Sequence, residues 1–336
     1  MHTRINSSMN QKGVISIVVT MIIMIILTLI VTGFSQIARN EQREALDRQL
    51  STQATYAAES GINDARRAIA GGFEGEKTDC APNAAVSNNT VGNNIGYSCL
   101  LIKQILPDIK LGNVTPTEST VLPLNSVNAA GTPQALNNLF IEWKSKDVTK
   151  TSIPPTTGRF LPANTWSTNN YFGVLRIDLI PAGTLSADEL QNNTYTAFLY
   201  PRSGGSSTHP YTNVPAQQGQ VLTAQCNTAN NTCSVNITGL SQFKYFIRVK
   251  SLYEPSEVKL CGTSACLSST SFKGAQAEID STGKANDQLK RIKVRVNDVS
   301  ELSNTKTLPN YAFDSAEDVC KKLSVYPGGA DLGGCL

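Results

Sequence analysis

Eight cysteines are the residues of this sequence best suited to chemistry, and all of them follow residue 79. An even number of thiols, all on one side of an apolar segment, predicts disulfides in an oxidising compartment. Many pairings are possible, and we favour sequential pairing because each neighbouring pair brackets a short loop. The cysteines are Cys80, Cys99, Cys226, Cys233, Cys261, Cys266, Cys320 and Cys335.

A zinc site is the alternative use of these thiols. It would combine Cys226, Cys233, Cys261 and Cys266. Their spacing is wider than that of the usual zinc knuckle, so we expect no metal site.

Other catalytic groups are scarce. The chain has two histidines, His2 near its start and His209 in a Ser/Thr/Pro-rich segment, and it has no G-x-S-x-G motif. The carboxylates Asp178, Asp188 and Glu189 could pair across a cleft, but acids at a surface are the simpler interpretation. We therefore predict no catalytic residue, no cofactor and no enzymatic activity.

The composition excludes one class of partner and favours one class of fold. Charged residues make up 16% of the chain and the net charge is +3, which gives no basis for a specific nucleic-acid site. Abundant Asn, Thr and Ser favour turns and strand surfaces over long helices. This composition is typical of an exported β-rich domain.

The element that must position such a domain begins near the N-terminus. No charged side chain occurs from Val14 to Ala38, and such a length of apolar helix spans a bilayer. Arg4 and Lys12 precede it, which favours the N-terminus inside and the long chain outside. A cleaved secretory signal is the alternative, but the apolar run is longer than a signal core and no Ala-x-Ala-like site follows.

An amphipathic helix is expected to continue this segment over residues 39–70. Apolar or small residues recur three or four positions apart, and Gly71-Gly72 then ends the pattern. Together Val14–Ala70 predict one helix of about 85 Å, far longer than a membrane needs. We expect its stripe to be an assembly face made of Leu46, Leu50, Ala54, Ala57, Ala58, Ile62, Ala65 and Ile69.

These residues resemble a type IV prepilin. The polar leader ends in Lys12-Gly13, an apolar helix follows, and Tyr56-Ala57-Ala58-Glu59-Ser60-Gly61 is similar to the A-A-E-[AS]-G segment of PilX-type minor pilins. The resemblance implies that a prepilin peptidase cuts after Gly13 and methylates Val14. It also implies an inner-membrane subunit that contacts lipid, an assembly platform and other pilin subunits before joining an extracellular pilus.

One departure indicates which kind of subunit this is. Major pilins carry a glutamate at the fifth mature position, where this chain has Val18. The resemblance therefore favours a minor or tip subunit that primes assembly or mediates adhesion or DNA uptake. The alternatives are a type II secretion pseudopilin, which shares this N-terminus, and a membrane-anchored extracellular enzyme or binding protein.

The remaining chain is expected to form an antiparallel β-rich head stapled by disulfides, so the fold class is α+β. We expect a leader at 1–13, a transmembrane helix at 14–38, its amphipathic extension at 39–70 and the head at 71–336. Residues 277–280 and Gln288–Asn297 are expected to form a hairpin, with Ser281-Thr282-Gly283 entering the turn. Further strands are expected at Leu139–Trp143, Gly173–Ile180, Thr194–Tyr200, Gln220–Ala224, Ser234–Ile237 and Phe243–Ser251, and a weaker one at Tyr97–Leu106.

Overall fold

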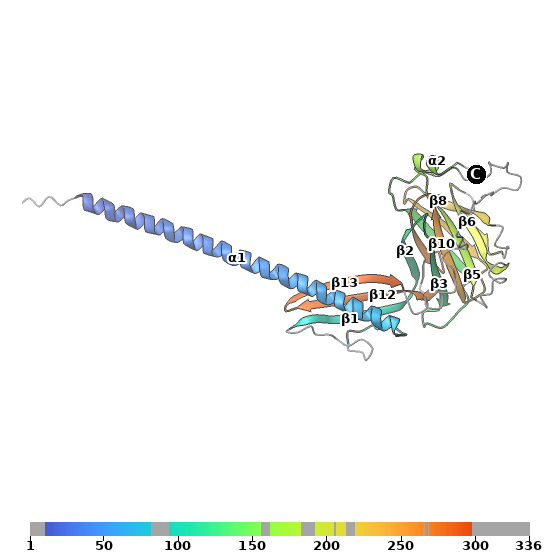
Figure 1. The fold of residues 1–336 in the computed structure, drawn as a ribbon, viewed down its shortest axis with the longest axis horizontal. Coiled ribbons are helices and arrows are strands. Elements are labelled where there is room, and N and C mark those ends of the chain that lie inside the picture. Colours follow the sequence, from blue (N-terminus) through green and yellow to red (C-terminus); the bar gives the residue numbers. More distant parts are fainter. Residues whose placement is uncertain are drawn as a thin grey trace, which may run out of the picture. The chain divides into compact units, whose positions relative to one another are not determined.

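The computed structural model describes residues 11–81, 94–155, 162–182, 192–204, 206–212, 219–264, 266–267 and 269–297. The chain divides into two compact units. The first comprises Met1–Gly61, Asn88–Ser98 and Ser281–Ile292, and the second comprises Ile62–Ser87, Cys99–Asp280 and Lys293–Leu336. Figure 1 labels many of the elements, which are α1 Gln11–Ala70, β1 Ile95–Leu106, β2 Asp108–Val114, β3 Thr120–Val127, β4 Asn138–Ser145, α2 Ala163–Thr168, β5 Val174–Pro181, β6 Tyr195–Arg202, β7 Thr208–Pro210, β8 Gln220–Asn227, β9 Thr232–Thr238, β10 Lys244–Leu252, β11 Ser256–Cys261, β12 Ser271–Ala285 and β13 Gln288–Asn297.

The long helix α1 ends where the glycine pair predicts. The N–H of Gly72 donates to the carbonyl of Ile69 at 3.0 Å, and that of Phe73 donates to Ala68 at 2.9 Å. Gly72 has a φ of 88°, the left-handed conformation that glycine adopts without steric cost. These two bonds form a Schellman motif, which satisfies the last carbonyls of the helix.

Beside the helix, the first unit holds the start of β1 and the tip of the β12–β13 hairpin (Figure 1). The turn lies at Asn286–Asp287, between the two strands, and Asn286 has a φ of 54°, which asparagine tolerates better than most residues. The expectation that Ser281–Gly283 enter the turn is wrong, because all three lie inside β12. Gly283 serves close packing instead, as described below.

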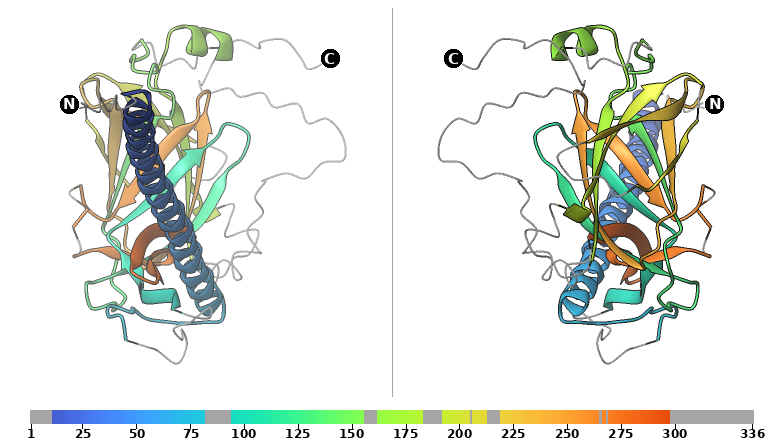
Figure 2. Two further views of the ribbon diagram at one scale, coloured as in Figure 1. Left: turned by 90° about the vertical axis from the view of Figure 1, so that its left-hand side faces the viewer. Right: turned by 90° about the vertical axis from the view of Figure 1, so that its right-hand side faces the viewer.

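The second unit is a two-layered β structure. Its strands follow the order β3-β10-β5-β6-β8-β9-β4-β11-β2, and Figure 2 shows them from two opposite sides. A single hydrophobic core receives side chains from both halves of this order, for example Leu122 and Ile177 from the first half and Ile141 and Leu260 from the second. The strands therefore enclose one core between them, as in a β-sandwich.

The structure confirms the α+β class, with a long apolar helix followed by a large β domain that contains disulfides. Pairing is not entirely antiparallel, however. β6 pairs in parallel with β8, because the long connection between Arg202 and Gln220 lets the chain return in the same direction. β7 likewise pairs in parallel with β9.

Candidate functional site: the N-terminal helix and the strands that hold it

The helix α1 has two parts that differ in what covers them. From Ile17 to Ile37 its large apolar side chains are exposed, and even the least exposed, Ile30, has 47% of its surface open. This is one helix long and apolar enough to cross a membrane, judged by length and composition. Apolar area of this extent has to be covered by lipid or by other chains.

The three threonine hydroxyls in the exposed apolar part form hydrogen bonds within the helix. Thr20 donates to the carbonyl of Ile17 at 2.9 Å, Thr28 to that of Met24 at 2.7 Å, and Thr32 to that of Thr28 at 2.9 Å. An apolar medium offers these groups no other partner. Internal hydrogen bonding therefore lets the three threonines lie in an apolar environment at low cost.

Past residue 53 the strands of the first unit cover one side of α1. Ala54 and Ala58 are fully buried, and Gly283 of β12 lies so close that a Cβ there would overlap the carbonyl oxygen of Ala54 and the amide nitrogen of Ala58. One turn further along, Gly61 faces Ser281, and a Cβ at Gly61 would lie 3.0 Å from the ring of Tyr97. Small residues on both elements thus allow the backbones of helix and strand to touch.

These contacts also fix the direction of β12. Ser281 lies at Gly61, whereas Gly283 lies between Ala54 and Ala58, so the strand runs against the helix, toward its N-terminal end. Two hydrogen bonds tie this strand and the turn after it to β1 and the segment before β1: the Ser98 hydroxyl donates to the carbonyl of Thr282 at 3.3 Å, and the N–H of Asn286 donates to the carbonyl of Asn94 at 3.2 Å. We call these four contacting positions, Ala54, Ala58, Gly61 and Gly283, the helix clasp.

The structure divides the predicted assembly face. Ala54, Ala57, Ala58, Ile62, Ala65 and Ile69 are all less than a tenth exposed, so the chain itself covers them. Leu46 is 58% exposed and Leu50 is half-buried. Only these last two residues of the stripe have surface left for a neighbouring subunit. The predicted processing site falls at Gly13 and Val14, whose backbone lies within α1.

Six of the cysteines pair in sequential order. Cys80 joins Cys99, Cys226 joins Cys233, and Cys261 joins Cys266. Cys226 and Cys233 lie directly opposite each other on β8 and β9, with Cα atoms 3.9 Å apart. The alternative of a four-cysteine zinc site is wrong, because all four of its thiols are used in disulfides. Cys320 and Cys335 lie outside the described residues.

The candidate catalytic groups are not brought together. The Nε2 atom of His209 lies 2.8 Å from the carbonyl oxygen of Thr223, a structural contact. Asp178 is buried, accepts a hydrogen bond from Thr196 at 2.8 Å, and lies 3.2 Å from Arg176 and 3.6 Å from Arg248. Asp188 and Glu189 lie outside the described residues. Within the described part of the chain, no group of three His, Cys, Asp or Glu side chains could hold a metal ion.

The largest pKa shifts belong to phenols in the core. Burial raises the pKa of Tyr195 to about 12, and burial with neighbouring Tyr245 raises that of Tyr211 to about 12. The rings of Tyr195 and Tyr211 pack with centroids 5.0 Å apart. These phenols stay neutral at physiological pH and fill space, so they are packing groups.

Sequence reasoning did not find the strand side of the clasp. Gly283 was interpreted as a residue entering the hairpin turn, although a glycine between alternating strand residues also indicates close backbone approach. Only the small residues at Ala54, Ala57, Ala58 and Gly61 gave a hint, because such residues let another element come near.

Comparison with known proteins adds an independent finding on the helix. The family model described as PilX N-terminal matches residues 12–63, a range that covers the exposed apolar run and three of the four clasp positions, Ala54, Ala58 and Gly61. No curated protein and no solved structure matched the chain. The helical segment 12–63 therefore matches the N-terminal segment of PilX-type type IV pilins.

Proposed function

We propose that this protein is a minor or tip subunit of a type IV pilus, anchored in the inner membrane before it joins the filament. One observation carries the proposal: residues 12–63 match the PilX N-terminal family, and the apolar run inside that range is left uncovered by the described chain. A subunit that must leave lipid for a fibre needs such a run, because neighbouring helices can then replace lipid without exposing apolar area to water.

The clasp supports a proposal in which two parts of the helix have different contacts. Residues before Ala54 would contact lipid first and other pilin subunits later, with Leu46 and Leu50 at the boundary. Residues from Ala54 onward are held by the protein itself, so the head keeps its packing through the transfer. Within lipid and within a fibre, association would depend on close packing and not on the hydrophobic effect.

The minor or tip role rests on Val18, which stands five residues after Gly13 in the place of the carboxylate of major pilins. An unpaired carboxylate in lipid is costly, so its absence removes both a cost and a docking group. The proposed partners are a prepilin peptidase acting between Gly13 and Val14, the inner-membrane assembly platform, lipid and other pilin subunits. In this role the head is structural or adhesive, with no enzymatic step.

Mass spectrometry of the mature N-terminus tests the proposal. We expect an N-methylated Val14 in the wild-type protein from its native membrane, and retention of the leader in Gly13→Ala. Gly33→Ala is the matched control, because Gly33 lies on the same helix with nothing within 4 Å of a Cβ, and it should be processed normally. An intact Met1, or a cut elsewhere, would leave an anchored exoprotein and defeat the pilin proposal.

A further inference from the structure

The strand β2 lies at the end of the strand order and, among the described residues, pairs with β11 alone. Such a terminal strand leaves alternate backbone N–H and C=O groups unpaired, and those groups can recruit a strand from another molecule. In β2 the residues concerned include Asp108 and Lys110, whose backbone groups are engaged by side chains from outside the β2–β11 ladder, as the next contacts show. We call these two residues the β2 edge.

One glutamine takes the place of the missing strand. The Oε1 atom of Gln276 accepts a hydrogen bond from the Lys110 N–H at 3.0 Å, and its Nε2 atom donates to the Lys110 carbonyl at 2.7 Å. This is the pair of bonds that a residue of a neighbouring antiparallel strand would make. Gln276 is only 5% exposed, so the contact is shielded from competing water.

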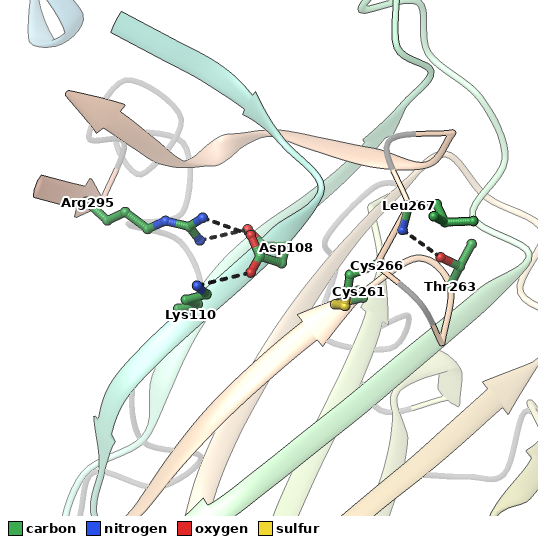
Figure 3. The surroundings of a disulfide bond; sticks show 7 residues. All are labelled: Asp108, Lys110, Cys261, Thr263, Cys266, Leu267 and Arg295. Carbon is green, nitrogen blue, oxygen red and sulfur yellow. Dashed lines mark hydrogen bonds and ion pairs between the residues drawn. A yellow bond between two sulfur atoms is a disulfide. The ribbon is translucent and has the colours of Figure 1, made fainter. Parts of the chain in front are cut away.

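An arginine closes the next position along the same edge (Figure 3). The Nη1 atom of Arg295 donates to the carbonyl of Asp108 at 3.3 Å, and Nη2 reaches the Asp108 carboxylate at 2.9 Å. Glu278 holds the guanidinium from its other side, with 3.4 Å between Oε2 and Nε. Lys110 adds a second cation, 3.5 Å from the Asp108 carboxylate.

If the edge were open, a second copy of this chain would be a fitting occupant. Two β2 strands related by a two-fold axis at Ile109 would pair antiparallel, with Asp108 of each copy opposite Lys110 of the other. The same backbone groups now bound by Gln276 and Arg295 would then bond across the axis. The opposed carboxylate and ammonium would add favourable cross-strand charge pairing.

We propose that Gln276 and Arg295 are an edge lock that keeps β2 from pairing with β2 of a second copy. The lock blocks self-association of a protein that the membrane or a filament concentrates. It acts through the head and is independent of how the N-terminal helix is processed. Natural sheets commonly protect their edges with charges, and here the protection is made by hydrogen-bonded side chains from the β12–β13 hairpin.

The test uses the full chain in detergent micelles. Gln276→Ala with Arg295→Ala removes both the edge bonds and the side-chain atoms that occupy the place of a second strand. At low concentration we expect amide exchange at Lys110 to rise about tenfold, the effect of losing one hydrogen bond. As concentration increases we expect dimers by light scattering, with exchange at Lys110 slowing again. Adding Asp108→Lys to this variant places like charges opposite each other and should abolish the dimer.

The control is Gln288→Ala, a matched substitution at the half-buried start of β13, which should behave as the wild type. Dimers formed through the apolar helix would occur equally in this control. A lock variant that melts like the wild type but stays monomeric at every concentration overturns the proposal, as does a dimer that survives Asp108→Lys. If the lock variant does not fold, the wild-type protein decides alone, because a Lys110 amide exchanging as fast as an exposed loop contradicts the lock.

Discussion

Replacing Gly283 by alanine is the most direct perturbation of the helix clasp. The new Cβ would overlap two backbone atoms of α1, at Ala54 and Ala58. A side chain could rotate away from such a clash, but a helix backbone cannot, so β12 must move outward. Overpacking of this kind lowers stability by about 1–3 kcal/mol. Because the atoms that clash belong to the helix backbone, we expect Gly283→Ala in the upper part of that range.

Hydrogen exchange of the helix amides measures this cost locally. A loss of about 2 kcal/mol from the opening free energy raises exchange about 30-fold. We expect that increase in peptides covering Ala54 and Ala58, with little change in the core strands of the second unit. A local readout is preferable to a single melting temperature because two compact units need not unfold together.

In the control for Gly283→Ala, the expected change in amide exchange has the opposite sign. Gly33→Ala introduces the same methyl group at an open position of α1, the helix that Gly283 contacts. There alanine is the better helix former by about 1 kcal/mol. Exchange near Gly33 should therefore slow slightly. If the amides near Ala54 and Ala58 exchange in Gly283→Ala at the wild-type rate, the new methyl group is accommodated. That result would refute the argument that backbone contact holds the helix.

Two further predictions concern the second unit. Asp178→Asn keeps the hydrogen bond from Thr196 but removes the buried negative charge that faces Arg176 and Arg248. These arginines are partly exposed, so we expect a loss of about 3 kcal/mol in urea unfolding, and an unchanged midpoint would contradict it. Tyr195→Phe removes a buried hydroxyl that has no hydrogen-bond partner within the described part of the chain, and it should stabilise the protein by up to about 1 kcal/mol at neutral pH. Because the folded-state pKa of Tyr195 is raised from 10.0 to about 12, its contribution is present below pH 10 and lost as pH rises toward 12. Stability measured across that window should therefore fall less steeply in Tyr195→Phe than in the wild type, and equal slopes would contradict the assignment.

Long periodic segments could be predicted from the sequence. The helix was expected over Val14–Ala70 and extends over Gln11–Ala70, because a proline-free segment and a terminal glycine pair leave few alternatives. The strand Gln288–Asn297 was placed to the residue, since its apolar and basic side chains alternate. The sequential disulfides followed from short loops between neighbouring cysteines.

Strands β2, β3, β7 and β11 were not predicted, although β11 alternates polar and apolar residues from Glu257 to Leu260, because such short alternating runs are weak signals. β3 contains Pro123, which argues against an internal strand because proline donates no ladder hydrogen bond. In the structure, β12 pairs with β3 only at Asn125–Val127, so Pro123 lies beyond that pairing, opposite Phe246 of β10. Such tolerance depends on where the neighbouring strand ends, which local sequence does not encode.

The amphipathic stripe shows that a periodic pattern does not name the partner of the helix face it predicts. Periodicity establishes that a helix face will be buried, but it does not identify what buries it. Here a strand more than two hundred residues away, in β12, supplies the cover for Ala54 and Ala58. The size of the residues was the better guide: a face of alanine and glycine suits a backbone at close range, whereas a face of leucine and isoleucine suits other side chains or lipid. On that criterion the helix changes partner between Leu50 and Ala54, where its side chains change from large to small and from exposed to buried.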